Sequence, residues 1–90
     1  MASPKTWFAY LVRCSGGTLY CGVTNHLRKR IAAHNAGKGA RYTRARRPVT
    51  LVWSRRCNSK SRAFKLEFAV KQLSRIEKNR LIARKMVEVF

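Results

Sequence analysis

Acidic residues are almost absent from this sequence. Its 90 residues include 21 Lys and Arg but three Glu and no Asp, so the formal net charge at pH 7 is +18. A charge of this size needs a polyanionic partner, and nucleic acid is the usual one. A membrane-surface protein would instead carry one basic amphipathic helix with aromatic residues on its other face, and no segment has that pattern. Because 46% of the residues are hydrophobic, the chain can bury a core, which excludes a disordered basic tail.

Long apolar runs and paired cysteines are also missing. The apolar stretch Trp7–Val12 ends at Arg13, far short of the roughly 18 residues of a spanning helix, and no small-residue cleavage site follows it. Cys14, Cys21 and Cys57 lack the paired short spacings of a disulfide framework or a zinc site. We interpret them as small buried hydrophobic residues in a reducing compartment. The sequence therefore predicts a cytoplasmic protein that does not enter a membrane.

A chain of this length without an internal repeat or linker predicts one domain over residues 1–90, with a core at about 6–84. The expected strands are Thr6–Cys14, Thr18–Val23 and Val49–Arg55. The expected helices run from a cap at Thr24 or Asn25 to about Asn35, from residues 58–61 to about Leu73, and from Ser74 to about Arg84. The order ββαβαα predicts an α+β fold, a small and mostly antiparallel three-stranded sheet flanked by helices. The tail, residues 85–90, could form an edge strand or pack down.

The scarcity of acids makes each of them informative. Glu77 completes a capping box with Ser74, and Glu88 lies in the unassigned tail. The second predicted helix carries an apolar stripe made of Ala63, Leu66, Val70 and Leu73. Glu67 lies at the edge of this stripe and faces the protein, so it is the candidate ligand for a divalent metal. The alternative for Glu67 is an ion pair with Lys71, four residues later on the same helix.

Two tyrosines and one helix face are the other candidates for chemistry. Tyr10 and Tyr20 fall on adjacent predicted strands and can face the same side of the hairpin. Neighbouring cations lower the pKa of a phenol and let it exchange protons with a water nucleophile. The alternative is that both residues are ordinary sheet tyrosines. Arg30 and His34 are four residues apart and share one helix face. An arginine there can neutralise a phosphate oxygen, or the face can be solvated and touch only backbone phosphates.

Taken in order, these residues resemble a known pattern. The matching pieces are Phe8-Ala9-Tyr10, Tyr20-Cys21-Gly22, Leu27–Ile31 with His34, and Glu67 in a helix. They are similar to the motifs of the GIY-YIG nuclease superfamily. Over nearly the whole chain the resemblance is to the small stand-alone UPF0213 type, most clearly in Gly37–Thr43 and Lys65–Lys78.

The resemblance implies a role for each matched residue. Tyr10 takes the place of the tyrosine that helps to activate water, and Tyr20 takes that of its partner. Arg30 corresponds to the arginine that stabilises the phosphate, and Glu67 to the glutamate that binds Mg²⁺ (or Mn²⁺). His34 falls where the family often has a histidine close to the site. Together they imply an endonuclease that hydrolyses DNA with one metal ion and needs no small-molecule cofactor.

Basic side chains around these positions predict contacts with a DNA backbone. The candidates are Arg28 and Lys29 on the first helix, and Lys38, Arg41, Tyr42 and Arg44 in the basic loop Lys38–Pro48. Tyr42 could stack on a base while the arginines hold phosphates, or the loop could simply be solvated. The alternative function is therefore a non-catalytic module that binds single-stranded DNA or RNA and retains this fold. Because the high positive charge disfavours self-association, we expect a monomer.

Overall fold

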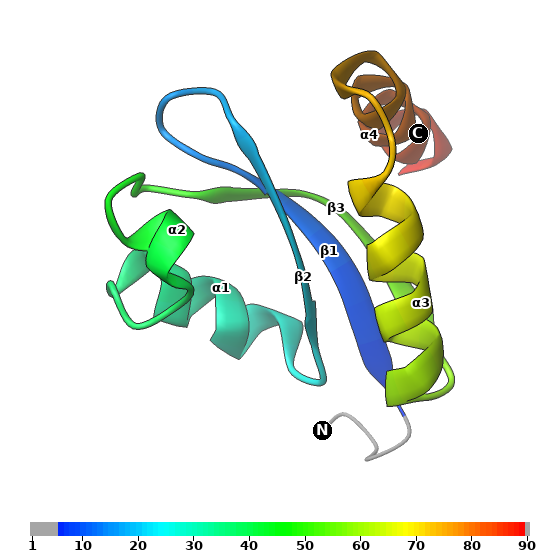
Figure 1. Cartoon of the computed structure of the whole chain (residues 1–90), viewed down its shortest axis with the longest axis horizontal. Coiled ribbons are helices and arrows are strands. Elements are labelled where there is room, and N and C mark those ends of the chain that lie inside the picture. The colour runs from blue at the N-terminus through cyan, green and yellow to red at the C-terminus, as the bar shows by residue number, and fades with distance from the viewer. Residues whose placement is uncertain (1–5, 90) are drawn as a thin grey trace.

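The computed structural model describes residues 6–89, with side chains as far as Arg84. Its strands are β1 (Trp7–Arg13), β2 (Leu19–Thr24) and β3 (Thr50–Cys57), which form one antiparallel sheet in the order β2-β1-β3. Its helices are α1 (Leu27–Asn35), α2 (Arg41–Arg44), α3 (Lys60–Lys71) and α4 (Arg75–Val89). The predicted α+β class and three-stranded sheet are confirmed, and Figure 1 shows α1 and α2 on one side of the sheet and α3 on the other.

The central strand β1 is buried on both faces, so its side chains alternate between two cores. One core, packed against α3 and α4, contains Ala9, Leu11, Cys21, Trp53, Val70 and Ile82. The other contains Tyr10, Val12, Cys14 and Val49, with Leu27 and Ile31 of α1 packed against it. Because neighbours in β1 face opposite ways, the position of a residue in the strand decides which helices its side chain can contact.

The ends of α1 differ in how well they were predicted. Its N-cap is His26, whose Nδ1 accepts a hydrogen bond from the Lys29 backbone N at 3.3 Å. The predicted cap at Thr24 or Asn25 is therefore wrong. The Thr24 hydroxyl accepts a hydrogen bond from the His26 backbone N at 3.1 Å, before the helix begins, and does not cap the first turn. The predicted stop at Gly37 is confirmed, since this glycine has φ +80°, a conformation that other residues rarely adopt.

The capping box that starts α4 is confirmed. The Ser74 hydroxyl accepts from the Glu77 backbone N at 3.1 Å, and a Glu77 carboxylate oxygen accepts from the Ser74 backbone N at 2.9 Å. Hydrogen bonding of the Glu77 carboxylate to the Ser74 backbone N and, after it, to the Ser74 side chain lowers the pKa of Glu77. The predicted end at Arg84 and the alternative edge strand are wrong, because α4 continues to Val89 without a glycine or proline to stop it. Phe90 lies outside the described residues.

The predicted basic loop contains a short helix, α2, that the sequence analysis did not expect. The Ala40 carbonyl oxygen accepts from the backbone N of Thr43 at 3.1 Å and of Arg44 at 3.2 Å, which closes one helical turn. The same oxygen accepts from the Thr43 hydroxyl at 2.9 Å. A turn of this length has no periodic apolar pattern, so composition alone marked the segment as loop.

Hydrogen bonds from one side chain and from the backbone fasten the loop to the sheet. Asn35 donates from Nδ2 to the Val49 carbonyl at 3.0 Å and accepts on Oδ1 from the Val49 backbone N at 2.7 Å. The Arg46 carbonyl accepts from the Ser15 backbone N, in the β1–β2 turn, at 3.0 Å. The loop is therefore held over the sheet face that carries Tyr10.

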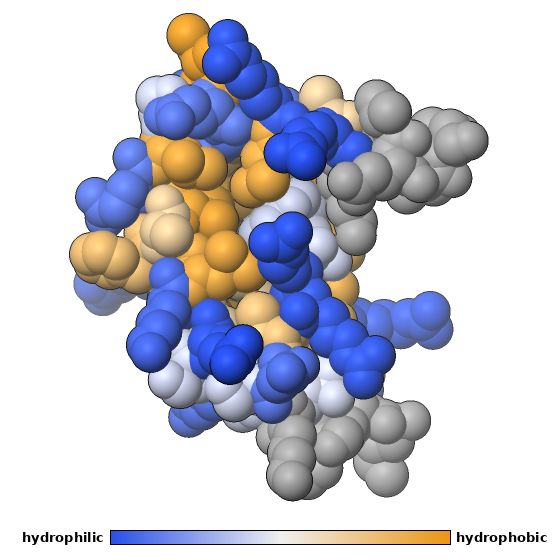
Figure 2. All heavy atoms as spheres, turned by 90° about the vertical axis from the view of Figure 1, so that its right-hand side faces the viewer, coloured by the Kyte–Doolittle hydropathy of each residue, from blue (hydrophilic) through white to orange (hydrophobic). Residues whose placement is uncertain are grey.

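The opposite side of the molecule has an apolar surface over α3 and the start of α4. Figure 2 shows this surface bordered by hydrophilic side chains. Phe64 and Phe68, one turn apart on α3, are 46% and 68% exposed, and Ile76 of α4 is 65% exposed. Within the described residues, no helix is both long and apolar enough to cross a membrane.

Candidate active site

Tyr10 lies in the middle of β1 and is fully buried, with 0% of its surface exposed. Its hydroxyl oxygen is 2.8 Å from Nε2 of His34 on α1. Arg30, one turn earlier on α1, donates from Nε to the same hydroxyl at 3.4 Å. The strand residue opposite Tyr10 is Gly22, where an added Cβ would come within 2.5 Å of the hydroxyl. The missing side chain at Gly22 therefore provides the space that the phenol occupies.

The hydrogen bonds around His34 define its tautomer. Its Nδ1 is 2.7 Å from the Thr43 hydroxyl oxygen, and that hydroxyl donates its proton to the Ala40 carbonyl. A hydroxyl has one proton, so the Thr43 oxygen must accept from a protonated Nδ1. In a neutral imidazole Nε2 then carries the lone pair, and the Tyr10 hydroxyl donates to it. The bonds therefore run in one direction from Arg30 through Tyr10, His34 and Thr43 to Ala40.

Burial controls the charge of both central groups. It raises the pKa of Tyr10 above 10.0, while the hydrogen bond and the positive charge of Arg30 act in the opposite direction. It lowers the pKa of His34 below 6.5, and the charge of Arg30 adds to this effect. The sequence analysis expected nearby cations to lower the pKa of a tyrosine. Arg30 does so at Tyr10, but the effect of burial is larger and the pKa is raised. At neutral pH the phenol is protonated and the imidazole is neutral.

Tyr20 lies on the same side of the hairpin as Tyr10, as predicted, since it is two residues from Gly22 on β2. Its ring meets the His34 ring edge-on, with centroids 5.6 Å apart and an interplanar angle of 67°. It also stacks on Tyr42, with centroids 5.8 Å apart and an angle of 21°. Tyr42 is 38% exposed, so a row of rings connects the buried Tyr10 cluster with the surface.

Three residues of this cluster were missed by the sequence analysis. Thr43 is fully buried and contacts His34. Gly22 makes room for Tyr10, and Gly39 lies so close to His34 that an added Cβ would overlap its Nδ1. Gly39 and Thr43 belong to the subgroup-like stretch noted above, but no spacing rule connects them to a histidine on another helix.

The predicted DNA-contacting side chains lie on the elements that cover this cluster, α1 and the loop after it. Those on α1 (Arg28 and Lys29) and those in the following loop (Lys38, Arg41 and Arg44) are all exposed. Arg46, which was not a candidate, places its guanidinium carbon 3.9 Å from the centroid of the Tyr42 ring and donates to the Tyr42 carbonyl at 2.7 Å. The face that carries Tyr10 is therefore bordered by exposed cations with an aromatic ring among them.

Glu67 is not part of the hydrogen-bonded cluster. It lies on α3, which packs on the opposite face of the sheet, and its side chain is 17% exposed. Its carboxylate pairs with the Lys71 ammonium at 3.5 Å, the alternative arrangement considered above. Its charge also acts on Cys21 of β2. Burial and, after it, the negative charge of Glu67 raise the pKa of the Cys21 thiol to about 11. Glu67 thus lies beside edge strand β2, whose other face carries Tyr20.

One carboxylate fits a particular kind of metal site. Among the described residues no group of three or more His, Cys, Asp or Glu could enclose a metal ion. Mg²⁺ commonly keeps several waters and is bound by one or two carboxylates together with substrate phosphates. The partly exposed Glu67 carboxylate fits such a site, in which the substrate and water supply the remaining ligands.

Comparison with protein families identifies relatives of this chain. The family model of the GIY-YIG catalytic domain matches residues 6–80. The chain belongs to the GIY-YIG family. The UPF0213 protein DP2720 of Desulfotalea psychrophila is 52% identical over 77 residues, covering 84% of this chain and 70% of that protein. The UPF0213 protein SH2523 of Staphylococcus haemolyticus is 47% identical over 75 residues, covering 83% of this chain and 92% of that protein.

Two solved structures of similar proteins have the same architecture. The solution structure of the UPF0213 protein BH0048 from Bacillus halodurans superimposes with a TM-score of 0.58 at 40% identity, covering 89% of this chain and 85% of that one. The solution structure of EF2693 from E. faecalis gives a TM-score of 0.63 at 31% identity, covering 97% and 93%. The resemblance to the UPF0213 type is confirmed, and GIY-YIG membership supports a nuclease-type function.

Proposed function

We propose that this chain is a metal-dependent DNA endonuclease that hydrolyses phosphodiester bonds. The observation that carries the proposal is the one-way chain of hydrogen bonds from Arg30 through Tyr10 to His34 and Thr43. In this arrangement the lone pair of His34 Nε2 can accept the proton of the Tyr10 phenol, and the Arg30 cation lies next to the same phenol. These are the groups that water attack on a phosphodiester requires, and the formal charge of +18 favours a polyanionic substrate.

In this mechanism Tyr10 relays a proton. A water that attacks the phosphorus gives its proton to the phenol oxygen, while the phenol passes its own proton to His34 Nε2. Tyr10 ends unchanged and His34 becomes an imidazolium. His34 can accept the proton at neutral pH because burial lowers its pKa and keeps it neutral.

Arg30 has two functions in the same scheme. In the free protein it is half-buried and its contact with the Tyr10 hydroxyl, at 3.4 Å, is longer than the usual limit of about 3.2 Å. A phosphate oxygen offers this guanidinium a shorter, charge-assisted bond. Movement of Arg30 toward the phosphate would neutralise its charge beside His34, which favours the imidazolium, and would open the buried Tyr10 hydroxyl to water.

Glu67 is the residue that would hold Mg²⁺ or Mn²⁺, together with water and a substrate phosphate oxygen. Such an ion would withdraw charge from the phosphate and stabilise the leaving oxygen. Lys71 pairs with Glu67 at 3.5 Å in the free protein and so orients its carboxylate.

The test compares wild type with Glu67→Gln and His34→Gln on labelled single-stranded, duplex and branched DNA, with Mg²⁺, Mn²⁺ or EDTA. We expect metal-dependent cutting by wild type, and a loss of about 10²–10⁴-fold when the proton acceptor His34 is removed. Lys71→Gln is the matched control, because it removes the ion pair but leaves the carboxylate, so it should still cut.

Two results would contradict the proposal. If Glu67→Gln cuts as fast as wild type, Glu67 is only the ion-pair partner of Lys71. If wild type binds DNA but cuts none of the three forms with either metal, the non-catalytic binding module is the better description. The exposed Tyr42 ring with Arg46 beside it would then serve as a stacking platform for a base.

A further inference from the structure

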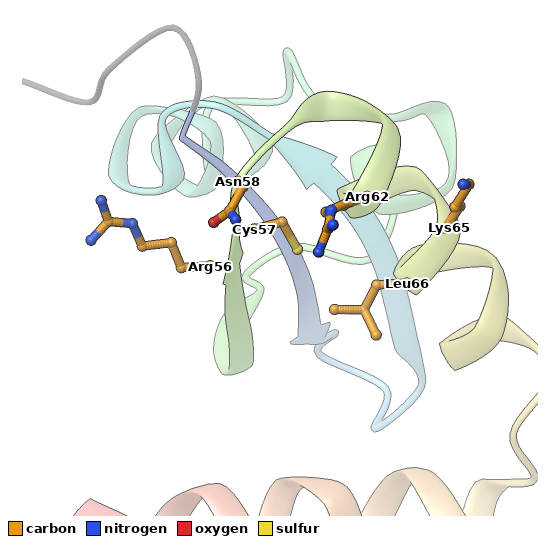
Figure 3. A pocket seen from close by; sticks show the side chains of 6 residues that line it. All are labelled: Arg56, Cys57, Asn58, Arg62, Lys65 and Leu66. Atoms are coloured by element: carbon orange, nitrogen blue, oxygen red, sulfur yellow. The ribbon is translucent and has the colours of Figure 1, made fainter.

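A hollow lies between the end of β3 and the start of α3, outside the Tyr10 cluster. It has a volume of about 280 Å³, just below the roughly 300–1,000 Å³ of most ligand sites. Its lining consists of Arg56, Cys57, Asn58, Arg62, Lys65 and Leu66, shown in Figure 3. The lining therefore combines three cations and an amide with two apolar groups.

The cations of the hollow have no acidic partner in the described part of the chain. The nearest acid along α3 is Glu67, which is already paired with Lys71. Arg56, Arg62 and Lys65 are exposed and form no ion pair there. Like charges gathered at one hollow repel each other, so an anionic ligand would be stabilised by all three at once.

The way these side chains point distinguishes between anions of different size. In the view of Figure 3 the Arg62 guanidinium lies between the side chains of Cys57 and Leu66, while Arg56 and Lys65 extend outward on the two opposite sides of the hollow. Cations spread along a rim suit an extended chain of phosphates better than one small anion held in the centre. The N-terminal end of α3, which has no acidic residue in its first turn, adds a favourable backbone dipole.

We propose that this hollow is a second DNA-contact site, which holds a sugar-phosphate segment through Arg56, Arg62 and Lys65. Leu66 and the Cys57 side chain form the apolar floor against which a sugar packs, and the Asn58 amide hydrogen-bonds to a phosphate oxygen. The inference rests on DNA being the ligand of the proposed nuclease. The site adds affinity and no chemistry, because it lies beside β3 and not in the cluster around Tyr10.

Cys57 provides a direct test of occupancy. All three cysteines are free thiols, but Cys14 and Cys21 are buried (3% and 5% exposed), whereas Cys57 is only half-buried. A neutral reagent, N-ethylmaleimide, should therefore label Cys57 first. We expect a saturating short DNA duplex to slow this labelling severalfold, while a mononucleotide at the same phosphate concentration has little effect. Equal labelling rates with and without the duplex would overturn the inference.

The salt dependence of binding gives a second readout. Arg56→Ala/Arg62→Ala should reduce the log–log salt slope of duplex binding by about 1.8, since each lost phosphate contact contributes roughly 0.9. It should also abolish the protection of Cys57 by the duplex. The matched control is Arg80→Ala/Arg84→Ala, which removes two exposed charges from α4.

The two double variants distinguish a specific DNA-contact site at the hollow from general electrostatic attraction of DNA to the whole surface. The inference is supported if only the first pair changes the slope and the protection, and it is refuted if both pairs change the slope equally. Cys14 and Cys21 report folding, because they stay unlabelled only while the cores are intact. If wild type binds and protects Cys57 but never cuts, the proposed nuclease function fails while the second DNA site stands.

Discussion

Removal of the Thr43 hydroxyl tests the tautomer assigned to His34. Thr43→Val replaces the hydroxyl with a methyl group of similar size in a position that is 0% exposed. The Nδ1–H of His34 then loses its acceptor at 2.7 Å, and the Ala40 carbonyl loses a donor at 2.9 Å. No described side chain other than Thr43 bonds to that nitrogen.

The magnitude follows from the cost of a buried donor without a partner, about 1–3 kcal/mol. In a domain of this size each kcal/mol lowers Tm by roughly 4–8 °C, so thermal unfolding should show the change clearly. Cutting should fall as well, because an imidazole no longer held as the Nδ1–H tautomer can present Nε2–H to Tyr10 and cannot accept its proton. The assay pairs a thermal melt with single-turnover cleavage.

Thr43→Ser is the control, since it keeps the hydroxyl and removes only a methyl group. It should retain most of the cutting rate, although the small cavity lowers Tm slightly. If Thr43→Val melts and cuts as wild type does, the Thr43 hydroxyl does not orient His34 and the reasoning is refuted.

Two further predictions concern the same cluster. Gly22→Ala should destabilise the fold by about 1–3 kcal/mol and abolish cutting, because the new methyl would lie 2.5 Å from the buried Tyr10 hydroxyl. Gly16→Ala, where nothing lies within 4 Å, should do neither in the same melt and cleavage assays. The lowered pKa of His34 means that the unfolded chain binds a proton more readily than the folded one below pH 6.5. The contribution of the neutral His34 to folding stability is therefore complete above pH 6.5 and is lost as the pH falls toward the folded-state pKa of this residue. Denaturant titrations should show a steeper acid-side loss for wild type than for His34→Gln, and identical profiles would contradict the cause assigned to the shift.

Local features of the fold were predictable because their causes lie within a few residues. The capping box of Ser74 and Glu77 and the stop at Gly37 each depend on hydrogen bonds or a backbone angle inside one turn. The wrong N-cap of α1 arose because two local hydrogen-bonding choices compete. The Thr24 hydroxyl could cap the helix directly, but it bonds to the backbone of His26, which is the actual cap.

The sequence by itself determined the fold class and the kinds of side chain from which the candidate site is built. The high positive charge, the two hairpin tyrosines, and Arg30 with His34 on one helix face could all be read from composition and spacing. The same holds for the single acid at the edge of an apolar stripe, Glu67.

Only the tertiary structure decided which of these groups contact one another. Tyr10 and His34, which share a hydrogen bond, are 24 residues apart in the sequence. Thr43 extends this series of hydrogen bonds from another helix, α2, in a segment without a periodic apolar pattern. The structure also placed Glu67 beside the edge strand on the opposite layer, paired with Lys71. Contacts of this kind depend on how the helices pack across the sheet and on the space left by Gly22 and Gly39, and no local pattern encodes that packing.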